Sequence, residues 1–202
     1  MKVKVCGINN EENLKSIIAL KVDWVGLNFY SESKRFFEIE LKTTDLSISK
    51  VGVFVDAKIE YIREMVGQYN LDYVQLHGGE SESYCQEAQS ICPVIKVFPV
   101  DEEFDFQLTS KFDFCDYFLF DTKCKEYGGS GFKFDWNKLN EYTGDVPFLL
   151  AGGIGPNDIQ EIKSISYGQL LGVDINSKFE IKPGLKDVNR IRRFLKELKN
   201  DT

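Results

Sequence analysis

The 202-residue sequence has a single histidine, His77, and its five cysteines include no CxxC pair. A protein zinc site needs several Cys or His ligands at short spacing, and no such pattern is present. The odd number of cysteines also argues against a disulfide framework and is typical of a protein in the reducing cytoplasm. We therefore predict a cytoplasmic protein without a metal site.

Long apolar runs and an excess of basic residues are also missing. No stretch reaches the length of a membrane span, and the first residues lack the apolar core of a signal peptide. The net charge is −7, and the densest group of cations, from Lys186 to Lys199, is interleaved with apolar and acidic residues. Nucleic-acid binding requires a basic face. We predict neither a membrane nor a nucleic acid as partner, and an anionic ligand must be held by local groups.

Apolar, strand-like segments alternate with helical patterns along the chain. The predicted strands are Lys2–Cys6, Trp24–Phe29, Val51–Val55, Tyr73–His77, Val94–Phe98, Tyr117–Phe120, Phe148–Ala151 and Gln169–Val173. Most are continuous apolar runs, as in strands buried on both faces, and the alternation implies parallel pairing with helical crossovers. The predicted fold class is α/β, a single-domain (β/α)8 TIM barrel over residues 1–202.

A doubly wound open sheet is the alternative architecture. It would place a G-x-G-x-x-G turn after the first strand, where this chain has only Cys6-Gly7-Ile8. The segment from Tyr30 to Lys50 fits neither the helix period nor the strand period, and we predict a short, irregular helix there.

Two turns late in the chain have the character of an anion site. Gly152-Gly153 follows the seventh predicted strand, and Asp174–Ser177 follows the eighth. Adjacent glycines let backbone N–H groups approach a ligand, and a helix N-terminus adds further N–H donors. Loops after strands 7 and 8 of such barrels frequently bind phosphate. The pattern predicts a phosphate site, and a plain tight turn is the other interpretation of the glycines.

Side chains at the ends of the predicted strands are the candidates for chemistry. Cys6 ends the first strand, and a thiolate there is a competent base or nucleophile, although many cysteines only pack. Asp121 ends an aromatic strand whose apolar surroundings suit a general acid; a helix cap or an ion pair with Lys123 is the alternative. His77 is either a base or a hydrogen-bonded structural residue.

A set of short motifs, taken in chain order, resembles one family over nearly the whole chain. The motifs are Lys4–Ile8, Ser33–Arg35, Val51–Phe54, Val74–Gly78, Leu119–Thr122, Gly128–Gly131, Ala151–Ile154, Gly172–Ser177 and Pro183–Asp187. The family that they resemble is phosphoribosylanthranilate isomerase of tryptophan biosynthesis.

The resemblance implies a cofactor-free Amadori rearrangement, the third step from chorismate to tryptophan. N-(5-phosphoribosyl)anthranilate becomes 1-(2-carboxyphenylamino)-1-deoxyribulose 5-phosphate. It implies that Cys6 is the general base, that Asp121 is the general acid, and that Arg35 faces the anthranilate carboxylate. We expect nearby positive groups and helix N-termini to favour the ionised form of Cys6. The other predicted substrate-binding residues are His77, Gly152, Gly153, Gly172, Asp174, Asn176 and Ser177. We expect phosphoribosylanthranilate as the small-molecule partner and a monomer or homodimer.

Two places depart from the family pattern, and two alternative functions remain open. Asn176-Ser177-Lys178 stands where a serine- and glycine-rich turn is usual, and the segment from Phe36 to Ser49 matches poorly. A related barrel isomerase of histidine biosynthesis is one alternative, but Cys6 stands where its pattern has a carboxylate. A non-catalytic barrel that binds a sugar phosphate is the other. The glycine-containing loop from Thr122 to Lys133 is predicted to close over the substrate.

Overall fold

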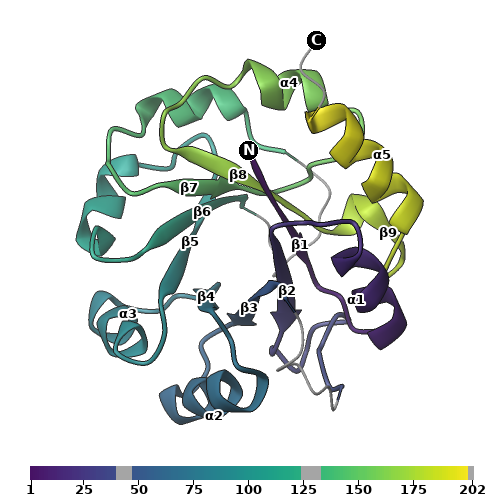
Figure 1. The fold of residues 1–202 in the computed structure, drawn as a ribbon. Coiled ribbons are helices and arrows are strands. Elements are labelled where there is room, and N and C mark those ends of the chain that lie inside the picture. The colour runs from purple at the N-terminus through teal and green to yellow at the C-terminus, as the bar shows by residue number, and fades with distance from the viewer. Residues whose placement is uncertain (40–46, 124–132, 200–202) are drawn as a thin grey trace.

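The computed structural model describes residues 1–39, 47–123 and 133–199, and within them eight parallel strands close into a barrel (Figure 1). The strands are β1 Lys2–Cys6, β2 Trp24–Asn28, β3 Ser49–Phe54, β4 Tyr73–Leu76, β5 Val94–Val100, β6 Tyr117–Thr122, β7 Phe148–Leu150 and β8 Leu170–Ile175. Neighbours in the barrel follow chain order, and β8 pairs with β1 to close it. The predicted (β/α)8 fold class is confirmed.

Helices surround the barrel on the outside (Figure 1). They are α1 Glu11–Ile18, α2 Ile59–Tyr69, α3 Glu82–Gln89, η2 Phe106–Phe112, η3 Trp136–Glu141, α4 Ile159–Ser164, η4 Ser177–Phe179 and α5 Val188–Lys199, the η elements being 3-10 helices. Side-chain caps start several of them; the Asn10 side chain, for example, accepts a hydrogen bond from the Asn13 backbone N–H at 2.9 Å. None of the helices in the described ranges is long and apolar enough to cross a membrane.

The prediction of a short helix between Tyr30 and Lys50 is wrong for the described part of that segment. Residues 30–39 and 47–50 contain turns, a bridge between Asn28 and Phe36, and the start of β3, but no helix. The Ser33 hydroxyl accepts hydrogen bonds from the Arg35 backbone N–H and from the Asn28 side chain, both at 3.1 Å. Such side-chain contacts stabilise turns in competition with a helix.

A short hairpin after β8 was not predicted. It consists of β9 (Glu180–Lys182) and β10 (Leu185–Lys186), which pair antiparallel. Gly184 lies between them with φ +84°, a backbone conformation that glycine adopts without strain. The hairpin folds back toward the carboxyl end of the barrel and brings Glu180 and Lys186 to the site described below.

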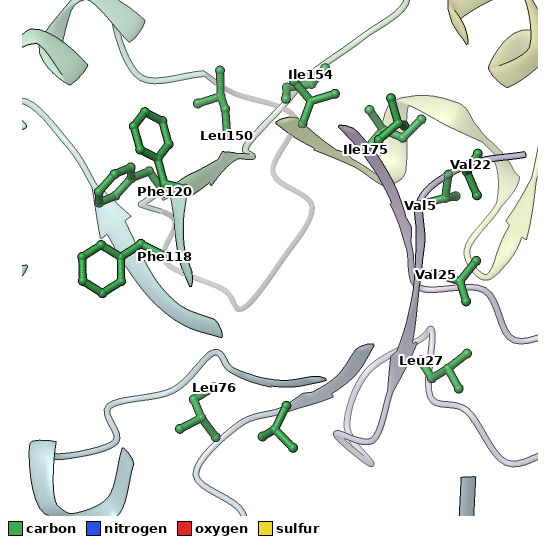
Figure 2. Packing of buried hydrophobic residues seen from close by; sticks show 14 of the residues in the cluster. Val5, Val22, Val25, Leu27, Leu76, Phe118, Phe120, Leu150, Ile154 and Ile175 are labelled. Atoms are coloured by element: carbon green, nitrogen blue, oxygen red, sulfur yellow. The ribbon is translucent and has the colours of Figure 1, made fainter. Parts of the chain in front are cut away.

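The two faces of each strand have different surroundings. Apolar side chains such as those of Val5, Leu76, Phe118 and Phe120 point away from the barrel centre toward the helices (Figure 2). Because side chains alternate along a strand, their neighbours in sequence face the interior. The barrel interior holds a second apolar cluster, which consists of Trp24, Val51, Ile95, Val97, Leu119, Leu149 and Ala151. Polar interior residues are therefore concentrated toward the carboxyl ends of the strands.

Candidate active site

Strand alternation brings the predicted catalytic residues to one rim of the barrel. Cys6 ends β1 and follows the outward Val5, while Asp121 follows the outward Phe120 in β6. His77 comes directly after β4. Cys6 is buried, whereas the side chains of His77 and Asp121 are each 21% exposed. All three lie where the functional side chains of parallel barrels are found.

A buried ion pair lies beside Cys6. The Lys4 ammonium donates a hydrogen bond to Asp174 Oδ2 at 2.9 Å, and Lys4 is fully buried. Asp174 keeps this lysine protonated and raises its pKa, in spite of the opposing effect of burial. Gly26 of β2 makes room for the thiol, because a Cβ at that position would lie 2.7 Å from Cys6 Sγ. Sequence reasoning did not identify Lys4, although it stands two residues before Cys6 on the same face.

The protonation of Cys6 differs from the expectation. Burial raises the pKa of the Cys6 thiol above its ordinary value of 9.0; the positive charges of Lys4 and Lys186 oppose this effect without cancelling it, and the Asp174 carboxylate adds to it. Arg35 also interacts electrostatically with the sulfur. Nearby cations are present as predicted, but desolvation outweighs them, so the neutral thiol is the favoured form in the free protein.

The raised pKa of Cys6 predicts the pH dependence of any reaction that uses this thiol as its base. A reaction that needs one ionised base and one protonated acid has a bell-shaped dependence of kcat/KM on pH. Because burial raises the pKa of the Cys6 thiol, the thiolate fraction continues to increase with pH beyond the ordinary thiol value of 9.0. The limb of the profile that reflects the ionisation of Cys6 should therefore lie above pH 9.0 and not near neutral pH. Initial rates measured from pH 5 to 11 check this, and an alkaline limb near neutral pH would contradict it.

His77 lies between Gln75 and Asp121. The Gln75 amide nitrogen is 3.1 Å from His77 Nδ1, and His77 Nε2 lies 3.4 Å from Asp121 Oδ2. With the amide nitrogen donating, Nδ1 is the acceptor and Nε2 carries the hydrogen that faces Asp121. The other oxygen of Asp121 accepts a hydrogen bond from the Thr122 backbone N–H at 2.8 Å. Lys123, the predicted alternative partner of Asp121, pairs with Asp101 instead.

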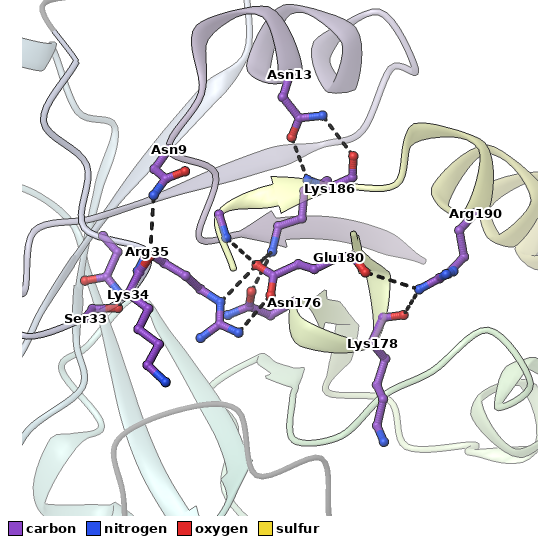
Figure 3. Close-up of polar contacts among 12 residues, drawn as sticks. Asn9, Asn13, Ser33, Lys34, Arg35, Asn176, Lys178, Glu180, Lys186 and Arg190 are labelled. Carbon is purple, nitrogen blue, oxygen red and sulfur yellow. Dashed lines mark hydrogen bonds and ion pairs between the residues drawn. The ribbon is translucent and has the colours of Figure 1, made fainter. Parts of the chain in front are cut away.

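Arg35 reaches the same rim from the loop after β2. Its Nε and Nη2 donate hydrogen bonds to the two carboxylate oxygens of Glu180 at 2.9 and 2.8 Å (Figure 3). Gly7 allows the arginine to pass the end of β1, because a Cβ there would lie 2.6 Å from Arg35 Cδ. The structure thus adds Glu180 to the site, a residue that no sequence pattern had indicated.

The two predicted anion-binding turns are neighbours in the structure. Gly152 and Gly153 have φ values of +87° and +67°, and a Cβ on Gly152 would lie 2.2 Å from Thr122 Oγ1. Among the described residues, no partner is found for the backbone N–H group of either glycine. The side chain of Lys178 lies 3.9 Å from a Cβ built on Gly155, so the loops after β7 and β8 are in contact.

Two of the predicted binding residues lie deeper than expected. Strand β8 extends to Ile175, so Asp174 is inside the strand and faces Lys4 rather than forming the start of a turn. Gly172 lies two residues before Asp174 and pairs with Lys2 of β1. A Cβ on Gly172 would lie 2.1 Å from the Lys2 carbonyl oxygen. The close packing of β8 against β1 therefore explains why a glycine stands at position 172. The turn itself begins at Asn176, whose side-chain oxygen accepts a hydrogen bond from Lys186 Nζ at 2.6 Å.

The predicted lid lies mostly outside the described residues. Of the loop from Thr122 to Lys133, the structure describes 122, 123 and 133, and Gly128-Gly129-Ser130-Gly131 are not among them. Lys133 pairs with Asp158 and Glu161 near α4. Across the described ranges, no group of three or more His, Cys, Asp and Glu side chains is arranged to hold a metal ion.

Comparisons with known proteins agree with this geometry. Residues 3–197 match the model of the family described as N-(5'-phosphoribosyl)anthranilate isomerase. A curated protein of that name from Parabacteroides distasonis is 45% identical, and the alignment covers 98% of this chain and 93% of that protein.

Solved structures are similar over the same length. Monomers generated from the dimeric phosphoribosylanthranilate isomerase of Thermotoga maritima share 28% identity, with a TM-score of 0.83 and 98% of both chains covered. A phosphoribosylanthranilate isomerase in complex with reduced 1-(o-carboxyphenylamino)-1-deoxyribulose 5-phosphate shares 29% identity, with the same TM-score and coverage. The chain belongs to the N-(5'-phosphoribosyl)anthranilate isomerase family.

Proposed function

We propose that Cys6 and Asp121 carry out the two proton transfers of the reaction that this chain catalyses. That reaction isomerises N-(5'-phosphoribosyl)anthranilate to 1-(2-carboxyphenylamino)-1-deoxyribulose 5-phosphate in tryptophan biosynthesis. The observation that carries the assignment is the position of the two residues on one rim, at the carboxyl ends of β1 and β6. Turnover of authentic substrate, followed by the loss of anthranilate-adduct fluorescence, tests the activity directly; binding without turnover would identify a non-catalytic barrel.

Ring opening is the step assigned to Asp121. Its carboxylic acid donates a proton to the furanose ring oxygen, and the bond from that oxygen to the anomeric carbon breaks. The nitrogen lone pair forms the C=N bond of a protonated imine, while the ring oxygen becomes a hydroxyl group. His77 and the Thr122 backbone N–H hold the carboxyl group in place, and the Asp121 side chain is still 21% exposed.

Proton abstraction is the step assigned to Cys6. The thiolate removes the proton from the sugar carbon next to the imine, and the C–H electron pair forms a C=C bond while the C=N pair returns to nitrogen. The resulting enol tautomerises to the ketone of the product. A buried thiolate is a strong base because desolvation raises its pKa, and Lys4 and Lys186 lie close enough to stabilise its charge.

Arg35 is the residue proposed to bind the anthranilate carboxylate. With Nε and Nη2 bound to Glu180, the guanidinium still has an end edge, formed by Nη1 and Nη2, for a second carboxylate. Arg35→Lys should lower kcat/KM by roughly tenfold or more, because an ammonium keeps the charge but cannot bind two carboxylates through a planar fork. Steady-state kinetics check this, and an unchanged kcat/KM would remove Arg35 from the site.

The turns at Gly152-Gly153 and Asn176-Ser177 are proposed to bind the phosphate through backbone N–H groups. Positive φ at both glycines supports this proposal, and the Lys178 side chain approaches Gly155 of the neighbouring loop through its Cβ and Cγ atoms. Crystals soaked in sulfate or phosphate should have the anion at these two turns. An anion bound only elsewhere on the rim would show that the placement is wrong.

The oligomeric state and the cellular location of the protein can also be inferred. The phosphoribosylanthranilate isomerase of Thermotoga maritima is described as dimeric, and monomers of it have been generated. We infer that this chain is a monomer or a homodimer. The unpaired cysteines support a cytoplasmic enzyme, since the four that the structure describes are buried and free.

A further inference from the structure

Glu180 is the centre of a buried polar network at the edge of the site. Its carboxylate accepts four hydrogen bonds, from Arg35 Nε and Nη2, from the Gly184 backbone N–H at 3.0 Å, and from Lys186 Nζ at 2.7 Å (Figure 3). The side chain is only 5% exposed. A carboxylate with four donors in a buried position is held in one orientation.

We propose that Glu180 is a positioning residue that orients Arg35 for the carboxylate of the substrate. It binds the side edge of the guanidinium and thereby directs the end edge, formed by Nη1 and Nη2, toward the rim. The proposal rests on the proposed role of Arg35. It explains why an acidic residue stands beside a site that must bind an anionic substrate.

The surroundings of Glu180 show that it is anchored rather than a temporary occupant of the arginine. Lys186 is fully buried and also donates to the Asn176 side chain, and its backbone is held by Asn13 of α1 through bonds of 2.7 and 2.9 Å. Arg190 of α5 donates to the Lys178 carbonyl at 2.8 Å. If the Glu180 carboxylate were displaced from Arg35 by substrate, it would also have to leave the Gly184 backbone N–H and Lys186 Nζ, the other donors that hold it, in every turnover.

The charges of these side chains also indicate that Glu180 is a permanent partner of Arg35. Burial would raise the pKa of Glu180, but hydrogen bonds from Arg35 and Lys186 more than offset this and lower it, so the group is ionised. Its hydrogen bonds in turn keep Arg35 cationic by raising the arginine pKa. Burial lowers the pKa of Lys186 and Glu180 opposes this shift, whereas Arg35 is the more exposed of the two basic side chains that donate to Glu180.

The test compares two ligands that differ only in the carboxylate. One is reduced 1-(o-carboxyphenylamino)-1-deoxyribulose 5-phosphate, and the other is the same compound with an unsubstituted phenyl ring. Binding constants are measured by calorimetry for the parent and Glu180→Gln. Glu180→Asp is a second variant, which keeps the charge but shortens the side chain and is less disruptive to folding. Glu141→Gln is the matched control, because Glu141 forms an exposed ion pair with Lys138 on η3.

The parent and Glu141→Gln should bind the carboxylated ligand much more tightly than the phenyl ligand. In Glu180→Gln this preference should fall by about tenfold, the value of one charge-assisted hydrogen bond, with the phenyl ligand bound as in the parent. Glu180→Asp should show a smaller fall in the same direction. An equal loss for both ligands, or tighter binding of the carboxylated one, would overturn the proposal. No preference in the parent would overturn the role of Arg35 itself, and this proposal with it.

Discussion

Cys6→Ala should lower kcat/KM on the order of 10² to 10⁴-fold or more, because it removes the proposed base for the sugar proton. Alanine keeps Cβ and removes only the sulfur atom, and the Lys4–Asp174 pair beside it remains. Binding of the reduced product analogue should therefore be largely kept. Fluorescence-monitored turnover and calorimetric binding on the same preparation measure both quantities.

Cys85→Ala is the matched control for that experiment. Cys85 is as buried as Cys6 but lies in α3, in the outer apolar cluster, away from the rim. It should lose stability through the small cavity without a comparable loss of turnover. If both variants lost activity equally, the effect of Cys6→Ala would reflect packing rather than catalysis.

Asp121→Asn should cost a similar factor, on the order of 10² to 10⁴ in kcat/KM, because the amide cannot donate a carboxylic proton to the ring oxygen. Asparagine preserves the shape, and its side-chain oxygen can still accept the hydrogen bond from the Thr122 backbone N–H. Affinity for the product analogue, whose ring is already open, should change little. Stopped-flow turnover and equilibrium binding measure the two effects.

Asp101→Asn serves as the control for Asp121. Asp101 is the aspartate that pairs with Lys123, next to the same strand end, and it has no contact with the rim residues in the described part of the chain. Its replacement should leave kcat/KM within about twofold, as expected for a surface ion pair. Activity of Asp121→Asn close to that of Asp101→Asn would show that another group protonates the ring oxygen.

Most of the barrel could be predicted because its strands are buried on both faces. The segments Lys2–Cys6 and Tyr73–His77 were found from their apolar character, and the observed strands end within one residue of them. The segment after β2 could not be predicted, since Ser33 stabilises turns there and its apolar residues follow no period. The hairpin from Glu180 to Lys186 was also missed, because strands of two or three residues leave too short a pattern.

The candidate site could be predicted only where a residue type stands at a strand end. Cys6, His77 and Asp121 satisfy that condition, and Arg35 came from the family resemblance. Lys4 could not be singled out from the sequence, because a lysine in a short first strand usually faces solvent, whereas here it is fully buried.

The role of Glu180 could not be predicted from the sequence, because its contacts join residues that are far apart in the chain. Its partner Arg35 is 145 positions away, and the hairpin that carries it becomes visible only in the folded structure. The end of β8 and its pairing with β1 could not be predicted either. Strand β8 continues to Ile175 and pairs Asp174 with Lys4 of β1, so Asp174 lies inside the barrel instead of in the turn that is proposed to bind phosphate.

Cys6, and not His77, is the proposed base that removes the sugar proton. The most direct test measures kcat/KM of Cys6→Ala and His77→Asn side by side with authentic substrate. The structure gives His77 a supporting contact with Asp121 at 3.4 Å, so His77→Asn should lose much less activity than Cys6→Ala. Abolished turnover in His77→Asn, with Cys6→Ala nearly as active as the parent, would contradict the assignment of the base.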